Sequence, residues 1–111
     1  PQFDCSRVPP AYTTFAAHSS PLGLAFFDAS NTLLKDSFLV ALHGAGKAYI
    51  GTGYKVVRFT PASRHPENFV LGFRSKGKVN GRPCGIFPLG PDSFLVTDDL
   101  NGVIYSIHRK M

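Results

Sequence analysis

Apolar residues in this chain occur in short runs rather than at helical spacing. The runs are rich in Val, Ile, Leu, Phe and Tyr and are bounded by Gly, Pro, Asn, Asp or Ser, which is typical of strands separated by turns. No segment shows the sustained 3.6-residue period of an amphipathic helix. Seven strands are predicted, at residues 22–27, 37–42, 54–60, 68–73, 82–87, 93–97 and 103–108. The pattern therefore predicts an all-β chain.

Turn residues group these strands into two sets. Asn101-Gly102 lies between the last two runs, and both residues tolerate the positive φ of a hairpin turn. Pro91-Asp92 forms a second turn, so residues 82–108 are predicted to be a meander of three strands. An earlier meander of four strands spans residues 22–73. Residues 1–21 lack either periodicity and are predicted to be an irregular arm.

This four-plus-three grouping fits two architectures. A meander of four strands is the unit of a β-propeller blade, and a blade of three strands lacks its closing partner, which must come from elsewhere in the polypeptide. A standalone seven-stranded sandwich or barrel is the alternative, and the chain is long enough for it. Periodicity alone does not decide between the two.

Length, composition and charge limit the class of protein and of partner that this chain can represent. The chain has 111 residues, of which 43% are hydrophobic and 17% charged, so one small globular domain or a piece of a larger one is expected. The net charge of +5 favours an anionic partner. The basic residues form no block of like charges, which disfavours nucleic acid. Leu22 to Phe27, the longest apolar stretch, is too short to cross a membrane.

Few residues carry recognisable chemistry. The glycine-rich segment His43 to Lys47 is not a phosphate loop, because Ala48 stands where Ser or Thr is needed. The histidines and cysteines have no metal-site spacing, so no metal ligand is predicted. Asp98 and Asp99 are adjacent and would point to opposite faces of a strand, so we expect them to end a strand rather than to act as a carboxylate pair. Arg82 lies at the mouth of a strand, a position from which it could hold a carboxylate.

Five segments, in order, resemble the C-terminal part of the glucose/sorbosone dehydrogenase family. The resemblance covers about residues 16–108, nearly all of this chain and about the last third of a family member. The segments are residues 18–27 (HSSPLGLAFF), 38–44 (FLVALHG), 53–58 (GYKVVR), 81–83 (GRP), and 94–99 with 102–105 (FLVTDD and GVIY).

The resemblance implies a fold, a cofactor and a reaction. Family members are six-bladed β-propellers that hold pyrroloquinoline quinone (PQQ) and calcium, and they oxidise aldoses or related aldehydes by hydride transfer to the quinone. The chain would be the last complete blade, residues 22–73, and three strands of the closing blade, residues 82–108. Its partners would be the remaining blades and a small sugar or aldehyde, and its location would be periplasmic or secreted.

The resemblance also implies which residues bind the cofactor. The histidine base belongs to earlier blades, so these residues are not expected to be catalytic by themselves. Arg82, in Gly-Arg-Pro, is the expected partner of a PQQ carboxylate or quinone oxygen, and His43 and Gly44 are expected to line the same site. Ala45-Gly46-Lys47 departs from the family pattern of an aromatic followed by polar and basic residues. A non-catalytic propeller module and a standalone domain that binds an anion therefore remain alternatives.

Overall fold

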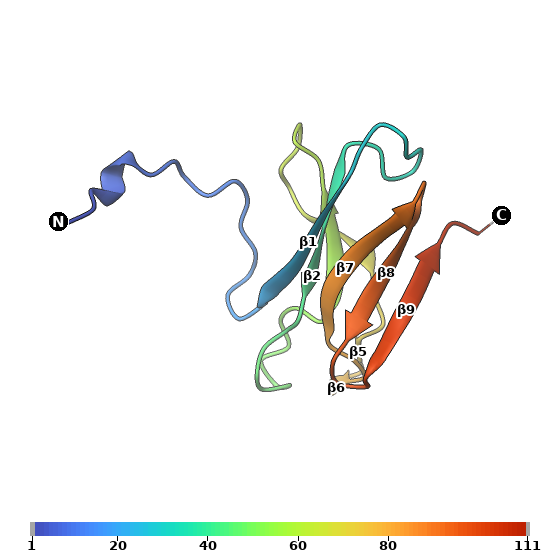
Figure 1. Cartoon of the computed structure of the whole chain (residues 1–111). Helices are drawn as coiled ribbons and strands as arrows, with labels where there is room; N and C mark the ends of the chain where they lie inside the picture. The colour runs from blue at the N-terminus through green and yellow to red at the C-terminus, as the bar shows by residue number, and fades with distance from the viewer. Residues whose placement is uncertain (1, 111) are drawn as a thin grey trace.

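Short antiparallel strands make up most of the regular structure in the computed structural model, which describes residues 2–110 (Figure 1). One 3₁₀ turn, η1, lies in the N-terminal arm at Cys5–Arg7. The strands are β1 Pro21–Phe27, β2 Ser37–Leu42, β3 Lys55–Phe59, β4 Glu67–Val70, β5 Arg74–Ser75, β6 Lys78–Val79, β7 Pro83–Gly90, β8 Ser93–Asp98 and β9 Val103–His108.

The strands pair strictly with their neighbours in sequence. They form a four-stranded sheet, β1-β2-β3-β4, a three-stranded sheet, β7-β8-β9, and a small hairpin, β5-β6, between the two. All pairings are antiparallel. Each strand thus pairs through local connections, as in a meander.

The main core lies between the two larger sheets. β1 and β2 pack against β7, and the Phe27 ring of β1 meets the Phe94 ring of β8 edge-on, with centroids 5.8 Å apart. Leu39, Val56 and Val96 are fully buried in this layer. Alternate residues of each strand face this layer, because successive side chains point to opposite faces.

A second apolar cluster covers the other face of the four-stranded sheet. β2 is almost entirely buried because both its faces are covered, and its Val40 and Leu42 belong to this second cluster. The arm contributes Phe15 to the cluster, and the guanidinium of Arg64 stacks 4.1 Å above the ring of Tyr12. The N-terminal part of the arm extends away from the sheets (Figure 1).

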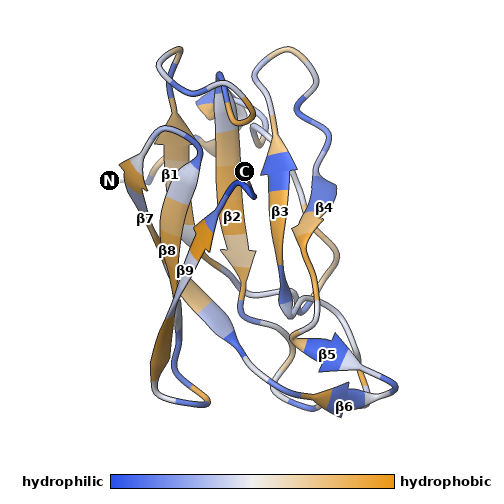
Figure 2. Cartoon of the chain, turned by 90° about the vertical axis from the view of Figure 1, so that its right-hand side faces the viewer, coloured by the Kyte–Doolittle hydropathy of each residue, from blue (hydrophilic) through white to orange (hydrophobic). Residues whose placement is uncertain are grey.

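The outer face of the three-stranded sheet has no such cover within residues 2–110. Phe87, Leu89 and Ile104 are 64%, 54% and 65% exposed. Figure 2 shows that β7, β8 and β9 contain many hydrophobic residues. The chain therefore presents apolar side chains on both sides of its core.

The all-β prediction is confirmed, and so is the grouping of four strands followed by three. The strand bounds agree within a few residues, and β1 begins at Pro21, the last residue of the predicted arm. The sequence pattern missed β5 and β6, because strands of two residues are too short to show alternation. It also ran the fourth strand to Phe73, whereas β4 ends at Val70.

Candidate functional site

Arg82 meets the β2–β3 loop at one end of the two sheets. Its Nε donates to the carbonyl oxygen of His43 at 3.2 Å, and its Nη2 donates to that of Gly44 at 2.8 Å. A longer contact of 3.5 Å joins Nη2 to the carbonyl oxygen of Ala45. The planar guanidinium thus spans successive carbonyls of a loop almost 40 residues away in sequence.

Gly81 and Pro83 explain how Arg82 is placed. A Cβ at Gly81 would lie 2.5 Å from Oδ2 of Asp98, so the close approach of this backbone to the carboxylate requires glycine. The Arg82 N–H then donates to Oδ1 of Asp98 at 3.0 Å. Pro83 is buried and begins β7, where its lack of an N–H is tolerated at the first residue of the strand. The side chain of Arg82 is thereby aimed at the β2–β3 loop.

Gly44 is required by its own neighbours. Its φ is +98°, and a Cβ there would overlap the ring of Tyr54. The hydroxyl of Tyr54 donates to the carbonyl oxygen of Ala45, and the Gly44 N–H donates to the carbonyl oxygen of Ser19 at 2.9 Å. The turn after β2 is therefore held by Tyr54 and Ser19 in addition to Arg82.

His43 pairs with an acidic residue of the β8–β9 turn. Its Nε2 lies 2.8 Å from Oδ1 of Asp99, and the His43 side chain is 15% exposed whereas that of Asp99 is 62% exposed. The pair joins the β2–β3 loop to the β8–β9 turn. It leaves the Asp99 carboxylate largely open to solvent.

Asp98, the last residue of β8, organises the turn beneath the site. It is 1% exposed and accepts hydrogen bonds from the N–H groups of Leu100 and Asn101, besides that of Arg82. The hydroxyl of Tyr105 donates to its Oδ2 at 3.2 Å. Burial raises the pKa of the Asp98 carboxyl. The hydrogen bonds to it, including that from the Asn101 amide, lower the pKa by more than burial raises it, so the pKa lies below the ordinary 3.8. Asp98 is therefore an ionised anchor of the loop.

The structure thus brings Arg82, His43 and Gly44 together. It also shows two neighbours that the sequence did not single out. The sequence predicts a turn at Asp99 but not its contact with His43, and it gives no indication of a role for Arg74. No sequence signal marked Arg74, because its place depends on the β5-β6 hairpin that periodicity missed.

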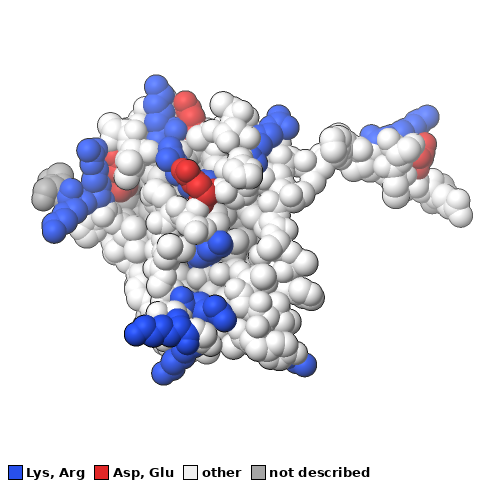
Figure 3. Space-filling model, turned by 180° about the vertical axis from the view of Figure 1, so that it is seen from behind, with Lys and Arg blue, Asp and Glu red and all other residues white. Residues whose placement is uncertain are grey.

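A cluster of basic residues lies at this end of the molecule, on the β5-β6 hairpin. The β5-β6 hairpin carries Arg74, Lys76 and Lys78 within five residues. Figure 3 shows Lys and Arg side chains at both the upper and lower ends of the visible face, whereas Asp and Glu side chains appear only towards the upper end. Such a distribution attracts anions to the end where Arg82 lies.

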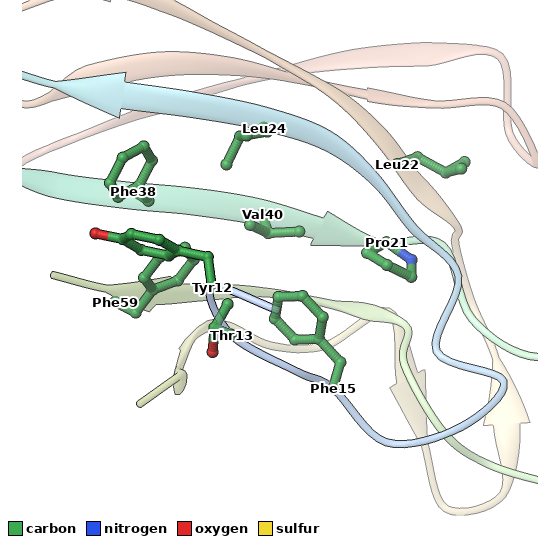
Figure 4. Close-up of a pocket in the computed structure, with 9 residues that line it drawn as sticks. All are labelled: Tyr12, Thr13, Phe15, Pro21, Leu22, Leu24, Phe38, Val40 and Phe59. Atoms are coloured by element: carbon green, nitrogen blue, oxygen red, sulfur yellow. The ribbon is translucent and has the colours of Figure 1, made fainter. Parts of the chain in front are cut away.

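An apolar groove lies elsewhere, on the outer face of the four-stranded sheet (Figure 4). Its volume is about 390 Å³, and the arm forms one wall while β1, β2 and β3 form the rest. Its lining residues are Tyr12, Thr13, Phe15, Pro21, Leu22, Leu24, Phe38, Val40 and Phe59. The Thr13 hydroxyl is already used, because it donates to the carbonyl oxygen of Arg64 at 2.7 Å. This groove has no charged residue in its wall and does not contain the three predicted site residues.

Residues 2–110 gather no group of three or more His, Cys, Asp or Glu side chains that could hold a metal ion. Within the same residues, no helix is long and apolar enough to cross a membrane. Comparisons of the chain with protein-family models, curated proteins and solved structures found no match.

Proposed function

We propose that this chain is the C-terminal segment of a PQQ-dependent dehydrogenase that oxidises an aldose or a sorbosone-like aldehyde. One observation carries the proposal. Arg82 and the adjacent pair His43 and Gly44 come from two separate short motifs, and the guanidinium of Arg82 hydrogen-bonds to the carbonyls of that pair. Residues chosen for one binding site should lie together, and these do.

The charges of this end suit the cofactor that the proposal requires. PQQ carries three carboxylates, which need cationic hydrogen-bond donors in a partly dry site. Arg82 uses Nε and Nη2 on the loop, which leaves Nη1 with no hydrogen-bond partner among residues 2–110. Lys76 and Lys78 lie at the same end and are exposed. The largely exposed carboxylate of Asp99, beside His43, offsets part of this positive charge.

The role of this chain in the reaction is binding and orientation. The bound quinone supplies the hydride acceptor, and the protein positions it and sets its electrostatic surroundings. Arg82 would hold a carboxylate or a quinone oxygen through Nη1 while its other donors fix the loop. The base that removes the substrate proton would lie in earlier blades, so these residues alone would not catalyse. No calcium ligand is proposed within this chain, since residues 2–110 gather no suitable cluster.

The remaining blades of a six-bladed propeller are the proposed partners of the two sheets. The apolar groove and the exposed Phe87, Leu89 and Ile104 are the surfaces that neighbouring blades would cover. β9 pairs only with β8 among the described residues, so its other edge is available for a fourth strand. By the same resemblance, a periplasmic or secreted location is proposed.

The test is PQQ binding by the polypeptide that carries this sequence in its source, together with aldose-dependent reduction of a redox dye. Arg82→Ala is expected to weaken PQQ binding by about 1.5–3 kcal/mol, because a charge-assisted hydrogen bond is lost. Arg82→Lys keeps the charge but cannot span the loop carbonyls, so it should recover only part of the affinity. Lys35→Gln, at the opposite end of the four-stranded sheet, is the control. Unchanged affinity in Arg82→Ala would remove Arg82 from the site.

A non-catalytic propeller module is the second candidate, and one observation favours it. The donors Nε and Nη2 of Arg82 already bind backbone carbonyls, so this cluster is held together without a ligand. This candidate predicts that the source polypeptide binds no PQQ and reduces no dye with any aldose. Measurable PQQ affinity that depends on Arg82 would exclude it.

A further inference from the structure

Arg74, the first residue of β5, packs directly on the β2–β3 loop. A Cβ at Gly51 would lie 3.0 Å from Nη2 and 3.1 Å from the central guanidinium carbon of Arg74. The Nε of Arg74 is buried and has no hydrogen-bond partner among residues 2–110. A buried donor without a partner is unfavourable, and buried polar groups in native proteins are normally satisfied. No ligand can reach this enclosed Nε, so an anion bound by Arg74 would contact the outer part of its half-buried side chain.

Arg82 contacts the first part of the β2–β3 loop, and Arg74 contacts the last part of the same loop. Ala45 N–H donates to the carbonyl oxygen of Thr52 at 3.0 Å, so the segment that Arg82 holds runs beside the segment that Arg74 touches. A Cβ at Gly53 would lie 2.5 Å from the Cα of Gly44, which shows how closely the two segments approach. Both guanidinium groups therefore lie against the β2–β3 loop.

The path of the chain also brings the backbones next to the two arginines close together. The carbonyl oxygen of Phe73 accepts from the N–H groups of Asn80 and Gly81 at 2.7 and 3.1 Å. This closes the segment between Phe73 and Gly81 into a compact hairpin. Arg74 follows one end of that closure and Arg82 follows the other, so they leave the hairpin from adjacent positions.

The hairpin itself adds cations and no acid. Lys76 and Gly77 form its tip with φ of 52° and 76°, and Ser75 pairs with Lys78 across it. Two successive positive φ values are those of a tight type I′ turn, which fixes the lysines on a short, well-defined loop. The sequence has no Asp or Glu between Glu67 and Asp92. The nearby carboxylates of Asp98 and Asp99 lie outside the hairpin, where they hydrogen-bond to the Arg82 N–H and to His43, and they offset part of the positive charge.

We propose that Arg74 is a second anion-binding residue of the site that contains Arg82. The site would receive a small ligand with two or more carboxylates, one held at Arg82 and another at Arg74, with Lys76 and Lys78 adding attraction from the hairpin. Taking PQQ as that ligand rests on the proposed function. The inference that the two arginines bind a polycarboxylate is independent of the proposed function, because it is argued from the placement and charge of the arginines alone.

The experiment measures binding of PQQ, and separately of citrate as a simple tricarboxylate, to the polypeptide that carries this sequence. Titrations at several NaCl concentrations give both the Kd and its dependence on salt. Arg74→Gln is expected to raise the Kd of both probes about tenfold and to reduce the salt dependence, because one cation leaves the site. Arg74→Lys should lie between Arg74→Gln and the wild type. Lys35→Gln, an exposed cation of the β1–β2 loop, should leave both quantities unchanged.

A role of Arg74 in loop stability alone would lower the thermal midpoint without changing the salt dependence, and that result would overturn the inference. If Arg74→Gln does not fold, the double variant Lys76→Gln/Lys78→Gln changes only exposed hairpin residues and must weaken binding; unchanged binding would also overturn it. Citrate binding that needs Arg74, without PQQ binding, would sustain the inference and refute the proposed function. PQQ binding that needs Arg82 but not Arg74 would do the reverse. Binding of neither probe would refute both.

Discussion

Gly23 of β1 lies directly against the backbone of Cys84 in β7. A Cβ on Gly23 would come within 2.5 Å of the Cys84 carbonyl oxygen and 2.9 Å of the Cα of Gly85. The two larger sheets therefore approach each other at this point without an intervening side chain. Pairing a glycine with a glycine-containing strand permits this close approach. The separation of the two sheets depends on it.

Gly23→Ala is expected to destabilise the chain by about 1–3 kcal/mol, because the added methyl group must push backbone rather than a flexible side chain. Gly46→Ala is the matched control, since a Cβ at Gly46 would meet no atom within 4 Å. Chemical denaturation followed by circular dichroism measures both. Equal stability of the two variants would show that the two sheets can move slightly apart at Gly23 without a loss of folding free energy.

Asp98 and Asp99 are adjacent but are expected to respond very differently to substitution. Asp98→Ala removes a buried acceptor of several part-buried hydrogen bonds and should cost about 1–3 kcal/mol of stability. Asp99→Ala removes a largely exposed carboxylate and should change stability little. Thermal unfolding distinguishes them. A large loss in Asp99→Ala would mean that its pairing with His43 matters more than exposure indicates.

Asp92 joins the turn between β7 and β8 to the loop between β1 and β2. Its carboxylate accepts from the N–H groups of Thr32, Leu33 and Leu34 at 2.9–3.2 Å and from the Thr32 hydroxyl. The Asp92 N–H donates to Oδ1 of Asn31 at 2.6 Å. One residue thus fastens the two sheets at the end opposite Arg82.

The stability of this link depends on pH. The hydrogen bond from the Thr32 hydroxyl, with those of the backbone, holds the pKa of Asp92 below its ordinary 3.8 although partial desolvation raises it. The folded state therefore binds this proton more weakly than the unfolded state. The stabilisation is complete above the ordinary pKa and is lost as the pH falls through the lowered one. At pH values below about 4, we expect the thermal midpoint of unfolding to decrease as the pH is lowered. Asp92→Asn should make this decrease smaller. If the thermal midpoint depends on pH equally in Asp92→Asn and in the wild type, Asp92 is not the source of the dependence. Asp36→Asn is the control.

The isolated 111-residue chain is expected to self-associate. Its outer apolar face and the free edge of β9 are exposed, and both promote contacts between chains. Ile104→Lys places a charge on that edge strand and should shift the chain toward monomer, as measured by sedimentation velocity. Lys110→Gln is the control. A monomeric wild-type chain with cooperative unfolding would instead favour the standalone domain.

Much of the fold could be predicted because strand formation here is local. Alternating and continuous apolar runs bounded by Gly, Pro and Asn located all the long strands, and Asn101-Gly102 and Pro91-Asp92 marked real turns. Every partner in the larger sheets is a sequence neighbour, so order along the chain became order in each sheet. The short β5-β6 hairpin escaped, since two-residue strands have no period to detect.

The sequence by itself determined the seven longer strands, their order in the two larger sheets and the candidate identities of Arg82, His43 and Gly44. Only the tertiary structure decided that Arg82 reaches the carbonyls of the β2–β3 loop, that Asp99 pairs with His43 and that Arg74 lies on Gly51. The physical reason is the range of the interactions. Hairpins are encoded by residues a few positions apart, whereas these contacts join segments 23–56 residues apart and exist only once the two sheets have packed.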